Sequence, residues 1–287
     1  MPSLESVAGF GGKETRSVFI ACTAALAAHL LNRPVSINIE RDVDMSITGQ
    51  RHAFLLNYRA GCTREGKLKF LDLHMFSNAG FSLDLSQPVM DRALFHCDNV
   101  YKWPALRARG TLCQTNQPSH TAFRGFGGPQ GLMATETAIE HLAHALGMDP
   151  FLLRQLNFYS DGDRTHFGQP LVDFYVPRLW TELQAVSNLA DRSAAVEEFN
   201  RLNRWKKRGI AVLPTKFGIN FTAKFMNQGG ALVSQLTTFT GCCLLLRIFV
   251  SDHSLSIVFR LLWIITCRLL SIALLFHWTA LLGARVH

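Results

Sequence analysis

The sequence lacks the spacings that would tie its cysteines to a metal or to a disulfide framework. Its seven cysteines include no CxxC pair, and their separations fit neither a zinc module nor a small disulfide-stapled scaffold. We therefore expect reduced, mostly buried thiols in a cytosolic protein. The first residues also lack a basic region followed by an apolar stretch, so no secretory leader is predicted and the protein is expected to stay inside the cell.

Long runs of positive charge are missing as well. Lys+Arg 29 against Asp+Glu 21 gives a formal charge of +8, but apart from the short cluster at 204–208 the basic residues are dispersed, which argues against a nucleic-acid partner. With 287 residues, 48% of them hydrophobic, the chain can bury a sizeable core as one large domain or two ordinary ones.

The spacing of apolar residues predicts a mixed α/β (α+β) body. Gly147 is expected to cap a helix, and Gly61 and residues 65–66 are expected to form hairpin turns. The alanine-rich first helix is expected to be mostly buried. Strands are predicted over 35–39, 54–60 and 67–75, and helices over 13–31, 132–146, a short stretch from Pro150, and a pair over 176–203 broken near Asn188.

The tetrapeptide Gly-Phe-Gly-Gly occurs twice, at residues 9–12 and 125–128, each time ahead of an apolar helix. Glycine accepts positive φ and lets backbone N–H groups converge on an anion, so such turns suit phosphate binding. Neither loop completes a P-loop or a GxGxxG fingerprint. From these residues alone, a structural turn and a ligand cradle are equally good interpretations.

Five longer strings in one order are a more specific signal. The strings are Gly-Phe-Gly-Gly-Lys-Glu-Thr-Arg (9–16), Arg-Ala-Leu-Phe-His (92–96), Thr-Ala-Phe-Arg-Gly-Phe-Gly-Gly-Pro-Gln-Gly (121–131), Lys-Lys-Arg-Gly-Ile (206–210) and Pro-Thr-Lys-Phe-Gly-Ile (214–219). Together they resemble the molybdopterin-binding part of the xanthine dehydrogenase family, of which aldehyde oxidase is a close relative. The resemblance spans residues 9–232 and implies a partial molybdenum-cofactor-binding domain, with residues 1–8 unmatched and 233–287 an unrelated apolar tail.

The resemblance implies a cofactor site in the two glycine loops. Phe10, Gly11 and Arg124 would hold molybdopterin, and Phe10 and Arg124 would contact the molybdenum through it. Full-length members of the family also carry 2Fe-2S clusters, FAD and NAD in domains that this sequence does not contain. They are cytoplasmic homodimers, with a peroxisomal location also known in the family.

The resemblance also implies a purine site for xanthine or hypoxanthine. Glu14 and Arg92 would act in binding and catalysis, the carboxylate by hydrogen bonding one edge and the guanidinium by stabilising developing negative charge. Phe126 and Phe221 would clamp the flat ring, and Thr222 would add a hydroxyl. Aldehyde oxidases generally replace these two charged residues. The presence of both Glu14 and Arg92 therefore favours a purine hydroxylase over an aldehyde oxidase.

The family's general base is not among these residues. It is a glutamate in a Gly-Glu-Pro-Pro type motif, which the sequence lacks, as it lacks the family's later cofactor loops. Loss of a general base typically removes about 10²- to 10⁴-fold in rate. The chain by itself is therefore expected to retain no molybdenum and to oxidise no xanthine.

The apolar tail has several competing interpretations. Val233-Ser234 would be encoded by the bases of a splice-donor site, which favours intron read-through. A membrane-associated, non-enzymatic product is the rival, but Arg260 and Arg268 interrupt the apolar stretch 255–276, and each costs about 2.5–3.5 kcal/mol near the centre of a bilayer. An interfacial helix or a disordered, aggregation-prone segment fits this pattern better than a membrane span.

Overall fold

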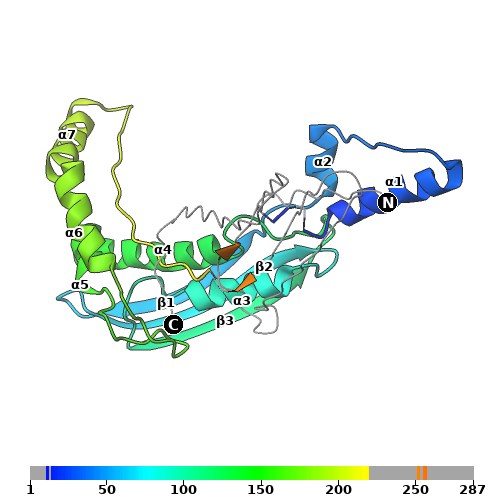
Figure 1. The fold of residues 1–287 in the computed structure, drawn as a ribbon. Helices are drawn as coiled ribbons and strands as arrows, with labels where there is room; N and C mark the ends of the chain where they lie inside the picture. The colour runs from blue at the N-terminus through cyan, green and yellow to red at the C-terminus, as the bar shows by residue number, and fades with distance from the viewer. Residues whose placement is uncertain (1–10, 13, 220–250, 253–254, 257–287) are drawn as a thin grey trace, which may run out of the picture. The chain divides into compact units, whose positions relative to one another are not determined.

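The computed structural model describes residues 11–12, 14–219, 251–252 and 255–256. Its contacts divide the chain into two units, Met1–Phe217 and Gly218–His287. In the second unit the structure describes a short antiparallel pair, β4 (Ser251–Asp252) with β5 (Leu255–Ser256). The mixed helix and sheet content predicted for the body is confirmed in the first unit (Figure 1).

A three-stranded sheet forms the base of the first unit. Its order is β1 (Phe54–Cys62), β2 (Leu68–Gly80) and β3 (Ala105–Gln114), with β1 antiparallel and β3 parallel to the central strand. Parallel neighbours require a crossover connection, and here helix α3 (Ser86–His96) supplies it. Helix α3 carries Arg92, one of the residues predicted for the site.

The two faces of the sheet differ in chemistry because successive side chains of a strand point to opposite sides. On β2, Leu71, Leu73 and Met75 are buried in the hydrophobic core. Asp72 lies between them in sequence and forms ion pairs with Arg59 of β1 and Arg107 of β3. Hydrogen bonds from Arg107 and then Arg59 lower the pKa of Asp72. The helices therefore cover the apolar face, and the other face is charged.

The covering helices follow the predictions for the middle of the chain. Helix α4 (Gly128–Leu146) packs against α3 and β1 and ends at Gly147, whose φ is +62°. The short helix that begins at Pro150 is α5 (Pro150–Leu156). The predicted pair is α6 (Val176–Ser187) and α7 (Leu189–Leu202), separated by Asn188 in the left-handed conformation.

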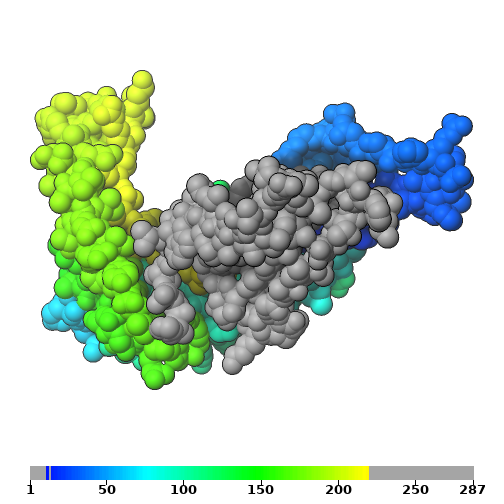
Figure 2. All heavy atoms as spheres, in the orientation of Figure 1, coloured from blue at the N-terminus to red at the C-terminus, as the bar shows by residue number. Residues whose placement is uncertain are grey.

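The first helical region differs from its prediction. Helix α1 (Ser17–Leu31) has no buried residue, and Figure 2 shows this part of the chain, in blue, at the surface. The expected burial is therefore wrong for the described residues. The apolar side chains of this helix lie on all its sides and favour no single face for packing, and no described element covers them. Residues 35–39, predicted as a strand, pair with no described strand, and α2 (Arg41–Ile47) follows them.

Two smaller expectations also need correction. Of the four cysteines in the described part, all free, only Cys97 is buried, whereas Cys22 is exposed. Gly61 lies inside β1 rather than in a turn, while Gly66 does lie in the tight connection to β2. No helix within the described ranges has the length and apolar character needed to cross a membrane. The apolar tail falls outside those ranges except for β4 and β5.

Candidate functional site

The first glycine loop contacts the second of the two repeated strings. Gly11 has a φ of +99°, and a Cβ atom at this position would lie 2.9 Å from the carbonyl carbon and oxygen of Ala122. Only glycine permits this conformation together with such a close backbone approach. The Glu14 N–H donates to the Gly11 carbonyl at 3.0 Å, which closes the turn. The strings 9–16 and 121–131 therefore meet through their backbones.

The second glycine loop has an unusual backbone over three successive residues. Gly125, Phe126 and Gly127 have φ values of +91°, +49° and +93°. Two turn hydrogen bonds, from the Phe126 N–H to the Phe123 carbonyl at 2.7 Å and from the Gly128 N–H to the Gly125 carbonyl at 2.8 Å, hold this conformation. A bulky residue such as Phe126 at positive φ costs about 1–3 kcal/mol, and such strained residues cluster at active sites, ligand clamps and switch regions.

Helix α3 packs against the second glycine-rich string. A Cβ at Gly127 would be 2.0 Å from the Val89 carbonyl oxygen, and one at Gly131 would be 2.3 Å from that of Ala93. The first string contacts the segment before the helix, where the Thr15 hydroxyl donates to Asp84 at 2.8 Å. The helix that carries Arg92 thus lies against the second string, and the first string adjoins its approach.

The structure describes five of the eight residues predicted for the site. Arg92 is 7% exposed, and burial lowers the pKa of its guanidinium. The Glu14 residue is exposed overall. The pKa of its carboxyl group is raised, mainly by partial desolvation and to a smaller extent by the negative charge of Asp84. Arg124 is exposed, with its carbonyl accepting from Arg51 at 2.6 Å. Gly11 and Phe126 are partly buried. The other three predicted residues lie outside the described residues: Phe10, Phe221 and Thr222.

Comparison with known families decides what these loops belong to. The family model described as "Molybdopterin cofactor-binding domain" matches residues 8–158, more than half of the chain. The chain belongs to this molybdopterin cofactor-binding family. The five ordered strings of the sequence had indicated the same family, and the contacts above show that three of them meet around α3.

The similar proteins include several xanthine dehydrogenases. Over 229 residues the chain is 53% identical to xanthine dehydrogenase 1 of Arabidopsis thaliana and 51% identical to both xanthine dehydrogenase of Dictyostelium discoideum and xanthine dehydrogenase/oxidase of Rattus norvegicus. Each match covers 80% of this chain and 17% of the relative. The chain therefore spans about a sixth of the length of the curated relatives it matches.

Solved structures of the same fold extend this result. The aldehyde oxidoreductase of Desulfovibrio gigas superposes with a TM-score of 0.60 at 28% identity, over 69% of this chain and 21% of that protein. The aldehyde oxidoreductase of Desulfovibrio desulfuricans has the same TM-score at 26% identity, over 66% and 20%. The architecture described here is thus that of the molybdopterin cofactor-binding domain.

One aromatic residue of the domain was assigned no role from the sequence. Phe217 contacts Arg92, whose Cζ lies 5.3 Å from the ring centroid, and His96, whose ring centroid lies 4.9 Å away. It belongs to the string 214–219, which contributed to the family resemblance, but an isolated Phe is usually a core residue. Only its position beside Arg92 indicates a role at the site.

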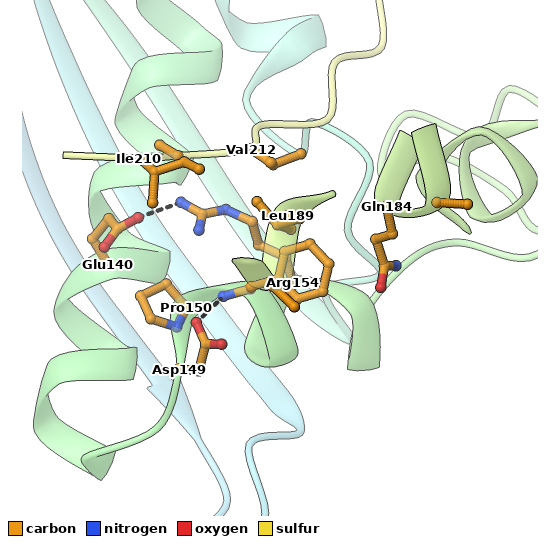
Figure 3. A pocket seen from close by; sticks show the side chains of 12 residues that line it. Glu140, Asp149, Pro150, Arg154, Gln184, Leu189, Ile210 and Val212 are labelled. Carbon is orange, nitrogen blue, oxygen red and sulfur yellow. Dashed lines mark hydrogen bonds and ion pairs between the residues drawn. The ribbon is translucent and has the colours of Figure 1, made fainter. Parts of the chain in front are cut away.

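One cavity lies elsewhere in the domain. It has a volume of about 590 Å³ and lies among α4, α5, α6, α7 and the segment 210–212. Figure 3 shows the ion pair between Arg154 and Glu140 at this pocket, together with Ile210 and Val212. None of the five described residues predicted for the site lines it, so the cavity is separate from them.

A buried histidine connects the elements that support the site. His52 is 2% exposed, and its Nε2 forms a hydrogen bond of 2.7 Å with the Ser86 hydroxyl at the start of α3. Its carbonyl accepts from Gln130 of α4 at 3.1 Å. Burial, and secondarily the nearby His120, lower the pKa of His52 to about 4.

This pKa predicts an acid-dependent loss of stability. Between pH 6.5 and 4, His52 is protonated in the unfolded chain but not in the folded chain. The free energy of unfolding therefore decreases as the pH is lowered through this range, by up to about 3 kcal/mol. Urea denaturation at several pH values should show a shallower decline for His52→Gln than for the wild type. His144→Gln, at an exposed histidine of α4, should keep the wild-type slope. Parallel curves for all three proteins would contradict the assignment.

Proposed function

We propose that this chain forms part of the pocket in which a molybdenum hydroxylase of the xanthine dehydrogenase type binds a purine beside its molybdopterin cofactor. The observation that carries the proposal is that the second glycine-rich string packs against α3, the helix of the buried Arg92, while the first string contacts both the second string and Asp84 just before that helix. We further propose that turnover needs parts of the relatives beyond this chain, because the general-base motif is absent from its sequence. An assay of xanthine oxidation by the purified chain, alongside analysis of its molybdenum content, tests that last point.

The backbone of the two loops fits a pterin cofactor with a phosphate group. Gly11, Gly125 and Gly127 have positive φ, a conformation found in turns whose backbone N–H groups bind anions, and Gly11 has no side chain to separate its loop from Ala122. Phe10, Gly11 and Arg124 would hold the cofactor, and Phe10 and Arg124 would adjoin its metal. The planar guanidinium of Arg124 suits paired hydrogen bonds to oxygen atoms. When bound, the cofactor supplies the redox chemistry.

The substrate residues act by charge and shape. Arg92 would stabilise negative charge on an oxypurine, and its burial strengthens that interaction because the local dielectric is low. The raised pKa of Glu14 extends the pH range over which its carboxyl is protonated and can donate a hydrogen bond. Phe126 and Phe221 would enclose the flat ring, and Thr222 would add a hydroxyl contact.

An aldehyde oxidase type of pocket is the second candidate. The observation in its favour is the likeness to two proteins named aldehyde oxidoreductase, at 28% and 26% identity. The likeness to xanthine dehydrogenases is much greater, at 51–53% identity. The two charged residues Glu14 and Arg92 also suit a purine with hydrogen-bonding edges better than a simple aldehyde. We therefore favour a purine.

Substitution of Arg92 tests the proposal directly. In isothermal titration of the full chain with xanthine, Arg92→Gln should weaken binding by about 10- to 100-fold, because a charge-assisted hydrogen bond is lost. Arg109→Gln removes an exposed arginine from β3 and should leave the affinity unchanged. Equal affinities for wild type and Arg92→Gln would refute the purine role. Stronger binding of benzaldehyde than of xanthine would favour the aldehyde alternative.

A further inference from the structure

Phe217 lies where the chain returns to the helix of Arg92. The Arg92 guanidinium is 5.3 Å from the centroid of the Phe217 ring, within the range of a cation–π interaction. One turn along α3, the His96 ring is 4.9 Å from the same centroid, and His96 Nδ1 is hydrogen-bonded to the Arg92 carbonyl at 2.8 Å. Phe217 therefore contacts the residue proposed to bind the purine and that residue's neighbour on the helix.

The position of Phe217 is set by two anchors just after the end of α3. Lys216 Nζ donates to Asp98 at 2.6 Å, and the Lys216 N–H donates to the Asn99 side chain at 3.3 Å. The Asn99 amide also donates to the Pro214 carbonyl at 3.0 Å. Asp98 and Asn99 are completely buried. Because they immediately follow the helix, the segment 214–217 is held at a constant position relative to Arg92.

The second glycine loop leaves the space that this ring occupies. A Cβ added at Gly128 would lie 2.6 Å from Cε2 of Phe217. Gly128 is also the first residue of α4, next to the three residues with positive φ. The ring thus fills the space between the glycine-rich loop and α3. Residues from three distant parts of the sequence meet at Phe217.

We propose that Phe217 is a positioning residue for Arg92. This inference rests on the proposed purine function of Arg92 and adds a residue that acts through it. The aromatic face holds the guanidinium in one orientation before the substrate arrives, so that less side-chain entropy is lost on binding. Phe217 is 47% exposed. If it served only to fill space, its substitution by leucine would leave the orientation of the Arg92 side chain nearly unchanged.

The first test measures the Arg92 side chain itself. In a ¹⁵N–¹H spectrum of the full chain, the Arg92 Nε–Hε signal is identified by its loss in Arg92→Gln. It should be displaced by the ring current of Phe217, and Phe217→Leu should move it toward the position of exposed arginines. Phe95→Leu is the matched control, because Phe95 is also on α3 but its ring contacts Phe167. This control should leave the signal in place.

The second test measures affinity for xanthine by titration. Phe217→Leu should weaken binding by about 3- to 10-fold, the range expected for loss of one cation–π contact, while Phe217→Tyr keeps the aromatic face and should retain wild-type affinity. In the Arg92→Gln background, Phe217→Leu should cause no further loss, because the two residues act as one unit. Should the leucine variant fail to fold in a thermal melt, Phe217→Met takes its place.

The results separate this inference from the proposed function. If the wild type binds no xanthine, the purine proposal fails and the Arg92 signal alone decides the role of Phe217. If Phe217→Leu leaves the signal unchanged, or weakens binding equally with and without Arg92, the positioning role is refuted. A displaced signal together with a non-additive loss of affinity supports it.

Discussion

Arg154→Met is expected to lower the free energy of unfolding by about 3–5 kcal/mol. Arg154 is 3% exposed, and its Nε donates to Glu136 at 2.9 Å, while a second nitrogen pairs with Glu140. The Glu136 carboxylate also accepts hydrogen bonds from Tyr101 and Asn99, each at 2.7 Å. Without the guanidinium, this partly buried carboxylate loses the cation that pairs with it.

Urea denaturation at pH 7 measures the effect. The matched control is Arg178→Met, because Arg178 forms an exposed ion pair with Glu182, and such pairs contribute about 0–1 kcal/mol. The double variant Arg154→Met with Glu136→Met should recover much of the loss, since it no longer leaves a buried charge unpaired. The explanation fails if Arg154→Met costs no more than Arg178→Met.

Gly127→Ala is expected to cost about 2–5 kcal/mol and to separate the loop from α3. Two effects combine: a φ of +93° strains alanine by about 1–2 kcal/mol, and the added methyl group would lie 2.0 Å from the Val89 carbonyl oxygen, an overlap that typically costs about 1–3 kcal/mol. The Val89 backbone belongs to the same helix as Arg92. Xanthine affinity should therefore fall together with stability.

Gly162 provides the control for this prediction. Its φ is +82°, but a Cβ there would have no neighbour within 4 Å, so Gly162→Ala retains only the conformational strain. Denaturation of the two variants and the wild type separates strain from steric overlap. Equal losses for Gly127→Ala and Gly162→Ala would show that the contact with α3 contributes nothing.

Several elements were predictable because their signals are local. The helix end at Gly147, the helix start at Pro150 and the break at Asn188 each depend on the conformational preference of one residue. The strands that became β1 and β2 were recognised by alternation, which one buried face of a sheet imposes. Burial of α1 was not predictable, because it depends on what packs against the helix and not on the helix itself.

The elements that were not predicted carry part of the site. Helix α3 buries Arg92 and His96, so polar residues stand where an amphipathic pattern would require apolar ones. Strand β3 alternates, but Gly110 interrupts its apolar positions because a side chain there would overlap Met90. In both cases the local pattern is weakened by a contact with another element.

The sequence by itself determined the family, because several long strings in one order specify it, and it determined which residue types are available to a cofactor and a purine. Only the tertiary structure decided that Phe217 contacts Arg92 and that Gly11 touches Ala122. The physical reason is that helix caps and strand alternation depend on neighbours along the chain, whereas these contacts join residues more than 100 positions apart and exist only once the elements have packed.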